Sequence, residues 1–143
     1  MDDETSIGHD LRQRVASSPF HRALGIDVVE ASEGFVRLRL DVREEQRNLQ
    51  GTVHGGIVAT LADTAMGFAV RTASDARRHV TVDLGVHYLR AAHPGTIEVV
   101  GTVVRAGATI AYAEADVIDA DGRLLARAHG TYSVVPARDV DPQ

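Results

Sequence analysis

A largely apolar run at residues 57–73, directly after two glycines, limits the possible folds more than any other part of the chain. Almost every residue of this run favours a helix, and apolar side chains would cover every side of that helix. Asp63 is the only ionisable residue between His54 and Arg71. Because a helix that is apolar all round is buried, we expect one long central helix that other parts of the protein must cover.

The chain on both sides of this run alternates between apolar and polar residues, the pattern of strands with one buried face. We predict six strands from it, at residues 24–29, 35–42, 79–88, 96–105, 109–119 and 123–135. In the third of them the predicted apolar face consists of Val80, Val82, Leu84, Val86 and Tyr88. Turn signals such as Asp121-Gly122 separate the later strands and no helical crossover joins them, so we expect a largely antiparallel sheet.

These elements predict an α+β architecture, in which a curved antiparallel β-sheet wraps around one long central α-helix. A single sheet covers only one side of a helix, so we expect strong curvature together with a second copy of the chain on the uncovered side. Residues 1–143 are predicted to form one domain, with a core at about residues 20–135 and frayed ends at 1–10 and 137–143. No stretch has the pattern of a membrane span or a signal peptide, so we expect a cytoplasmic protein.

The composition excludes several classes of chemistry. The chain contains no lysine and no cysteine, which removes Schiff-base catalysis, Walker A phosphate loops, thiol nucleophiles, disulfides and zinc fingers. Its net charge of −5 argues against nucleic acid as the main partner. None of the seven histidines forms an HExxH pair, and no serine lies in a nucleophile elbow. We therefore predict no metal and no bound cofactor, and expect chemistry by a carboxylate together with backbone amides.

Asp63 and the segment 54–56, His-Gly-Gly, are the candidates for that chemistry. A carboxylate inside an apolar helix is costly unless it is paired, so Asp63 is either a functional acid or base or the partner of an arginine in a structural ion pair. The first N–H groups of a helix lack partners within it, and glycine lets a substrate carbonyl approach, so the Gly55 N–H is a candidate oxyanion donor. Paired glycines also permit a tight entry into a helix and nothing more, and the residues alone leave both interpretations open.

The motifs around these residues resemble a known family. Segment 48–56 is Asn-Leu-Gln-Gly-Thr-Val-His-Gly-Gly, and Leu-Ala-Asp follows at 61–63. This is similar to the N-x-x-G-x-x-H-G-G…L-A-D signature of hotdog-fold acyl-CoA thioesterases, and most of all to the phenylacetic acid degradation (PaaI-like) group. The resemblance covers about residues 20–135. Aspartate at position 63 favours the PaaI-like group over related thioesterases that often have glutamate there.

The resemblance implies hydrolysis of an acyl-CoA or aryl-acyl-CoA thioester to the free acid and coenzyme A, which is part of the substrate and not a cofactor. In the implied site, the Gly55 N–H polarises the thioester carbonyl, and Asp63 acts as general base for water or as nucleophile. Asn48 contacts that carbonyl or the water, His54 holds the loop in shape, and Thr81 helps to place the water. Alternation alone does not say which face of its strand Thr81 shares with the site.

Further substrate contacts are expected at the ends of the coenzyme A molecule. Its phosphates need cationic partners, and arginines near strand ends or turns are the candidates. The predicted contacts are Arg77, Arg78, Arg90 and Arg105, together with Gly56 beside the oxyanion donor. The width of the acyl pocket is expected to depend on the packing of Met66, Phe68 and Leu89.

A hydratase or dehydratase and a non-catalytic sensor are the alternatives to hydrolysis. A hydratase or dehydratase of the same fold commonly places an Asp and a His close together in one motif, whereas the spacing of His54 and Asp63 fits the thioesterase pattern better. A non-catalytic acyl-CoA sensor usually carries a DNA-binding domain, for which this chain has neither the length nor a basic helix. The identity of the acyl group is not predicted.

The spacing of the two central residues predicts a site shared between chains. Gly55 and Asp63 are eight residues apart, which is about 12 Å along a helix. A reacting atom must lie within roughly 3 Å of each group that acts on it. We therefore expect a twofold homodimer in which antiparallel neighbouring helices bring Gly55 of one copy opposite Asp63 of the other. The resemblance implies the same dimer, often paired again into a homotetramer.

Overall fold

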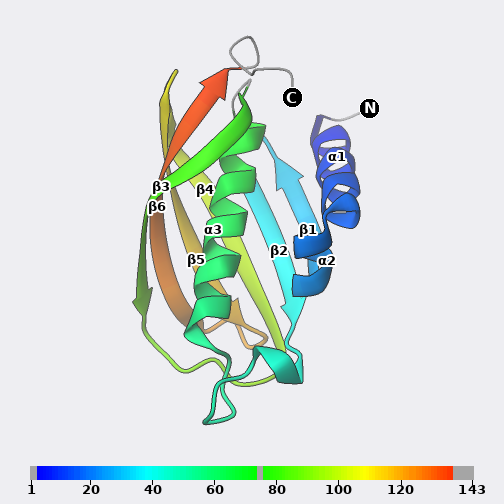
Figure 1. The fold of residues 1–143 in the computed structure, drawn as a ribbon, viewed down its shortest axis with the longest axis vertical. Coiled ribbons are helices and arrows are strands. Elements are labelled where there is room, and N and C mark those ends of the chain that lie inside the picture. Colours follow the sequence, from blue (N-terminus) through cyan, green and yellow to red (C-terminus); the bar gives the residue numbers. More distant parts are fainter. Residues whose placement is uncertain (1–2, 74–75, 137–143) are drawn as a thin grey trace.

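A computed structural model describes the backbone of residues 3–73 and 76–136, with side chains for residues 6–73 and 78–135. The elements, in chain order, are α1 (Asp3–Ser17), α2 (Pro19–Leu24), β1 (Ile26–Ser32), β2 (Phe35–Asp41), a short 3-10 helix (Glu44–Gln46), α3 (Gly55–Thr72), β3 (Ala76–Tyr88), β4 (Thr96–Ala106), β5 (Ile110–Asp119) and β6 (Leu124–Pro136). The strands form one antiparallel sheet in the order β1-β2-β4-β5-β6-β3. The curved sheet wraps around α3, which confirms the predicted architecture (Figure 1).

The predicted helix and strands agree with the observed ones to within a few residues. β5 and β6 are joined at the predicted turn, where Gly122 has a φ of 81°, a conformation that glycine adopts without strain. β1 and β2 form the predicted hairpin, with Gly34 at a φ of 74° in its turn. Local turn chemistry therefore predicted these two connections.

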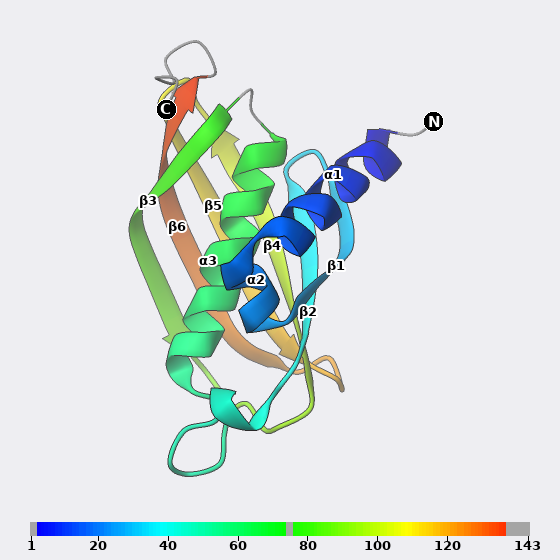
Figure 2. The same ribbon diagram turned by 45° about the vertical axis from the view of Figure 1, so that its right-hand side comes forward.

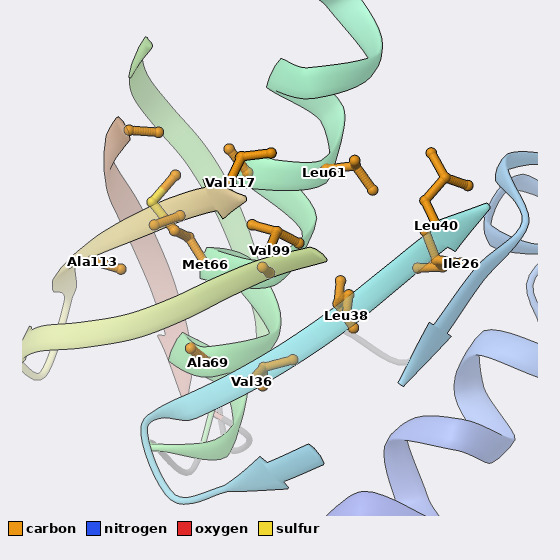
Figure 3. Packing of buried hydrophobic residues seen from close by; sticks show 14 of the residues in the cluster. Ile26, Val36, Leu38, Leu40, Leu61, Met66, Ala69, Val99, Ala113 and Val117 are labelled. Atoms are coloured by element: carbon orange, nitrogen blue, oxygen red, sulfur yellow. The ribbon is translucent and has the colours of Figure 1, made fainter. Parts of the chain in front are cut away.

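The core lies between α3 and the concave face of the sheet (Figure 3). α3 rests directly on β4, because a Cβ atom at Gly101 would lie 2.6 Å from the backbone carbonyl carbon and oxygen of Ala65. Only glycine allows this approach. The fully buried side chains around the contact include Val36, Leu38, Leu40, Leu61, Met66, Val99 and Val117.

A β-bulge in β3 overturns part of the predicted alternation. The pairing of β3 with β6 shifts register between Thr81 and Asp83, so that Val82 is an extra residue. A bulge of this kind changes which side chains face each side of the sheet. Val80 and Val82 are 55% and 64% exposed, whereas Leu84 packs against the core. The predicted continuous apolar face of this strand is therefore wrong for Val80 and Val82.

The N-terminal segment is helical from Asp3 onward, so the predicted fraying is wrong for residues 3–10, while residues 1–2 lie outside the described residues. Leu11 and Val15 of α1 are buried, and Ile7 packs against the same core. The three side chains share one face of the helix because they are spaced four residues apart. Their polar neighbours in the sequence make this short apolar face hard to predict. The predicted frayed tail at 137–143 lies outside the described residues.

The helices α1 and α2 lie along the β1 side of the sheet (Figure 2). Arg12 of α1 donates from Nε and Nη2 to the carbonyl oxygens of Val28 and Val29 in β1, at 3.1 and 3.2 Å. His21 of α2 packs on Phe68 of α3, with ring centroids 5.3 Å apart. Along the described chain, β3 at the other edge pairs with β6 alone. Within that part of the chain, no helix combines the length and apolar character needed to cross a membrane.

Candidate active site

The start of α3 is organised by His54. The ring Nδ1 of His54 accepts a hydrogen bond from the backbone N–H of Gly56 at 2.9 Å and so caps the helix. The backbone N–H of His54 donates to the carbonyl of Gln46, also at 2.9 Å. Among the described residues the Gly55 N–H has no acceptor. This free donor lies at the positive end of the helix dipole, so it can bind a carbonyl oxygen that gains negative charge.

The loop before α3 is held by Asn48. Its Oδ1 accepts the N–H groups of Gln50 and Thr52 at 3.0 and 3.1 Å, and its Nδ2 donates to the Thr52 hydroxyl at 2.8 Å. Asn48 and Gly55 line one pocket of about 330 Å³ that Arg90 also borders. The side chain predicted to contact the substrate therefore also shapes the loop that carries the oxyanion donor.

Tyr88 lies over the start of the helix on the same side. Its hydroxyl donates to the carbonyl of Gly55 at 2.7 Å, and its ring would be 3.5 Å from a Cβ at that position. Leu89, which follows it, is exposed and lines the same pocket. Glycine at position 55 thus keeps open a narrow space between the Tyr88 ring and the helix N-terminus.

Asp63 lies two turns further along α3, where two hydroxyl groups converge on one of its oxygens. Thr81 Oγ1 donates to Asp63 Oδ1 at 2.8 Å, and the Tyr132 hydroxyl lies 2.9 Å from the same atom. No arginine pairs with Asp63 among the described ion pairs. The structural ion pair weighed as the alternative is therefore not formed within the described part of the chain, and Thr81 is on the face of β3 that meets Asp63.

One side of the Asp63 carboxylate faces buried side chains, and the other side faces solvent. Tyr132 is fully buried, and its burial and the charge of Asp63 raise the pKa of its hydroxyl, which stays protonated. His79 packs edge-on against Tyr132, with ring centroids 6.0 Å apart. Asp63 itself is half-buried, and Thr81 is exposed. An ionised carboxylate here can reach a substrate from the open side.

The structure brings the predicted site residues together in two groups within one chain. Asn48, His54 and Gly55 lie at the start of α3, and Asp63 with Thr81 lies two turns away, about 12 Å along the axis. The other predicted substrate contacts lie in different places. Gly56 is exposed, with its N–H bound to His54, and Arg90 borders the pocket. Arg78 and Arg105 are exposed, and the side chain of Arg77 lies outside the described residues.

Of the residues expected to set the width of the acyl pocket, only one lines the pocket at Gly55. Met66 is fully buried in the core, with its Cε 3.2 Å from a Cβ at Gly130. Phe68 packs on α2, and Leu89 lines the pocket. In the described part of the chain, no three or more acidic or histidine side chains gather as metal ligands.

Sequence reasoning missed Tyr132. The inward-facing positions before it in β6 carry small residues, Ala126, Ala128 and Gly130. A tyrosine that follows them on a buried face needs a partner for its hydroxyl, and Asp63 is the one acid of the buried helix. This signal was present in the sequence, but it joins residues 69 positions apart.

The fold and these motifs match known proteins. The family model described as thioesterase superfamily matches residues 50–126. A Halobacterium salinarum protein, described provisionally as an esterase, is 42% identical over an alignment of 123 residues, and the match covers 78% of this chain and 81% of that protein. Human acyl-coenzyme A thioesterase 13 is 33% identical over an alignment of 134 residues, and the match covers 89% of this chain and 96% of that protein.

The solved structure of the E. coli PaaI protein, from the phenylacetic acid degradation operon, has a TM-score of 0.85 to this chain. The match covers 94% of this chain and 96% of that one at 21% identity, and it shows that the two share a fold. Together with the sequence matches, this confirms the hotdog fold. The chain belongs to the thioesterase superfamily and is an enzyme that hydrolyses thioesters.

Proposed function

We propose that this enzyme hydrolyses acyl-CoA or aryl-acyl-CoA thioesters to the free acid and coenzyme A. The observation that carries the proposal is the pair of groups on α3: a Gly55 N–H without an acceptor and an Asp63 carboxylate held through one oxygen. The human relative named acyl-coenzyme A thioesterase supports coenzyme A as the thiol. Thioester hydrolysis needs a donor that stabilises the developing oxyanion and a group that acts as base or nucleophile, and these two groups can supply both.

In this mechanism the thioester oxygen lies against the Gly55 N–H, which stabilises the negative charge that develops as the carbonyl carbon is attacked. Asp63 either removes a proton from the water that attacks the carbon, or attacks the carbon itself to form a mixed anhydride that water then hydrolyses. On either route the acyl C–S bond breaks, and the coenzyme A thiolate leaves and takes up a proton to become the free thiol. His54 caps the helix and keeps the donor in place. Thr81 positions the carboxylate or the water, and Arg90 at the pocket rim binds a coenzyme A phosphate.

The distance between the two groups on α3 supports a site formed by two copies of the chain. About 12 Å along one helix is too far for Gly55 and Asp63 to act on one carbon. The half-buried side chains on one side of α3, Ile57, Thr60, Thr64 and Arg71, give a second copy a face to cover. A twofold homodimer would form two identical sites, and pairing of two dimers would give a homotetramer.

A panel of aliphatic and aromatic acyl-CoAs, assayed for thiol release, tests this proposal. We expect turnover of at least one class and a fall in kcat of about 10²–10⁴ in Asp63→Asn, since the amide cannot act as base. KM should change much less, and the circular dichroism spectrum should be unchanged. Binding of acyl-CoA without any thiol release, or wild-type turnover in Asp63→Asn, would contradict the proposal.

A further inference from the structure

The two oxygens of the Asp63 carboxylate have different surroundings. Oδ1 accepts hydrogen bonds from Thr81 at 2.8 Å and from Tyr132 at 2.9 Å, whereas Oδ2 accepts none from the described residues. The Tyr132 hydroxyl also lies 3.2 Å from the backbone carbonyl of Asp63. Two donors on one oxygen fix the rotation of the carboxylate about its Cβ–Cγ bond, so Oδ2 is directed to the side that the donors leave open.

The two donors differ in how firmly they are held. Thr81 is on the exposed strand β3, where a solvent molecule can replace its hydroxyl. Tyr132 has no exposed surface, and its phenol stays protonated because burial and the Asp63 charge raise its pKa. Since water cannot take its place, Tyr132 is the donor whose loss the site cannot compensate.

Two glycines shape the space that holds the tyrosine ring. A Cβ at Gly130 would lie 2.8 Å from Tyr132 Cε2 and 3.0 Å from its hydroxyl oxygen. A Cβ at Gly67 would lie 2.8 Å from His79 Nε2 and 3.7 Å from Tyr132 Cε1. The ring therefore fits against β6 only because Gly130 lacks a side chain, whereas Gly67 leaves room for His79 beside it, and the ring directs its hydroxyl at Asp63.

We propose that Tyr132 is a positioning residue for hydrolysis, which holds Asp63 through Oδ1 so that Oδ2 faces the reacting water or thioester carbon. This inference rests on the proposed function and adds a residue to it. Tyr132 does not touch the substrate, so its effect belongs to the chemical step. Gly130 serves the same end indirectly, by leaving room for the ring.

Tyr132→Phe tests the inference, because it removes the hydroxyl and keeps the ring. We expect kcat to fall about tenfold to a hundredfold, the range for a lost hydrogen bond to a charged group, with KM within about twofold of the wild type. The acid limb of the kcat profile should move to higher pH, because the ionised carboxylate loses a donor. Tyr112→Phe is the matched control, since Tyr112 stacks on His129 on the other face of the sheet and its loss should leave kcat unchanged.

Gly130→Ala displaces the ring by a second route. We expect a similar fall in kcat, and no further fall when it is combined with Tyr132→Phe, because both changes act through the same hydrogen bond. The carboxyl ¹³C resonance of Asp63 gives a readout that does not need turnover: it should shift in Tyr132→Phe and stay in place in Tyr112→Phe.

The outcomes separate this inference from the proposed function. A wild type without thioesterase activity would overturn both. An active wild type, with Asp63→Asn inactive and a folded Tyr132→Phe that keeps the wild-type kcat and pH profile, would overturn the positioning role alone. An equal loss in Tyr132→Phe and Tyr112→Phe would also overturn it.

Discussion

His79 is a histidine whose protonation is opposed by its burial in the fold. It lies on β3 beside Tyr132, and its Nδ1 is buried without a partner among the described residues. Burial lowers its pKa, and the nearby Arg71 lowers it further, while Asp63 acts in the opposite direction. Protonation of this ring would place a charge where little water can solvate it. His79 therefore links the stability of the protein to pH.

We expect this link to appear as a loss of stability in mild acid. Above its ordinary pKa of 6.5, His79 is neutral in both the folded and the unfolded chain and has no effect. Below that value His79 binds a proton in the unfolded chain but not in the folded chain. The free energy of unfolding therefore falls as the pH is lowered, until the pH reaches the lowered pKa of the folded state. His79→Phe should therefore lose less Tm than the wild type between about pH 7 and about pH 5.

The control for this measurement is His93→Phe, since His93 is exposed in the loop between β3 and β4. We expect its Tm to follow pH as that of the wild type does. An identical pH dependence in His79→Phe and the wild type would show that burial of this ring does not couple folding to protonation.

Among the elements, β3 combines two environments in one strand. The bulge at Val82 turns Thr81 toward Asp63 and lets Leu84 enter the core. A regular strand would place residues 81 and 84 on opposite faces, because side chains alternate. One extra residue thus allows a polar site and an apolar core to share the same side of the strand.

Deletion of Val82 should remove the bulge and leave Thr81 directed at Asp63, because Thr81 still pairs with Tyr132 and Asp83 with Thr131 in one continuous register. Because the carboxylate keeps its donor to Oδ1, we expect kcat to stay near the wild-type value, with the circular dichroism spectrum of the fold retained. Thr81→Val removes the hydroxyl and should lower kcat by less than Tyr132→Phe does, since solvent can take the place of the exposed hydroxyl. Val82→Ala keeps the bulge and should keep the rate. A large fall in kcat in a folded deletion variant would show that the bulge itself is needed to hold Thr81 against Asp63.

The difference between the regular elements and the bulged strand β3 also explains how much of the fold could be predicted from the sequence. The apolar pattern of α3 and the alternation in β2 indicate helix and strand because burial follows the period of each element. The bulge at Val82 breaks that period, and nothing in the local sequence marks it. Asp63 could be singled out as a candidate because it is the one acid of an apolar helix, and the family motif implied its role, whereas its bond to Tyr132 depends on the pairing of distant strands.

For the whole molecule, the shared site can be tested by mixing two inactive chains. Asn48→Ala loosens the loop that carries Gly55, and Asp63→Asn removes the carboxylate. In a mixed dimer one site has both defects and the other has neither. Random pairing makes about half of the dimers mixed, so co-expression should restore roughly a quarter of the wild-type activity. Tagged mixed dimers that form and yet stay as inactive as their parents would rule out the shared site.

The two edges of the sheet are not equivalent, and this limits how copies of the chain can aggregate. Arg12 and the N-terminal helices occupy the β1 edge, while β3 at the other edge pairs with β6 alone along the described chain. A sheet that is open at both edges can add further sheets end to end and grow into a fibre. A sheet with a single open edge can join only one other such edge, after which none is left. Edge-to-edge pairing of strands through the described part of β3 would therefore join two copies of this chain and leave no open edge for a third.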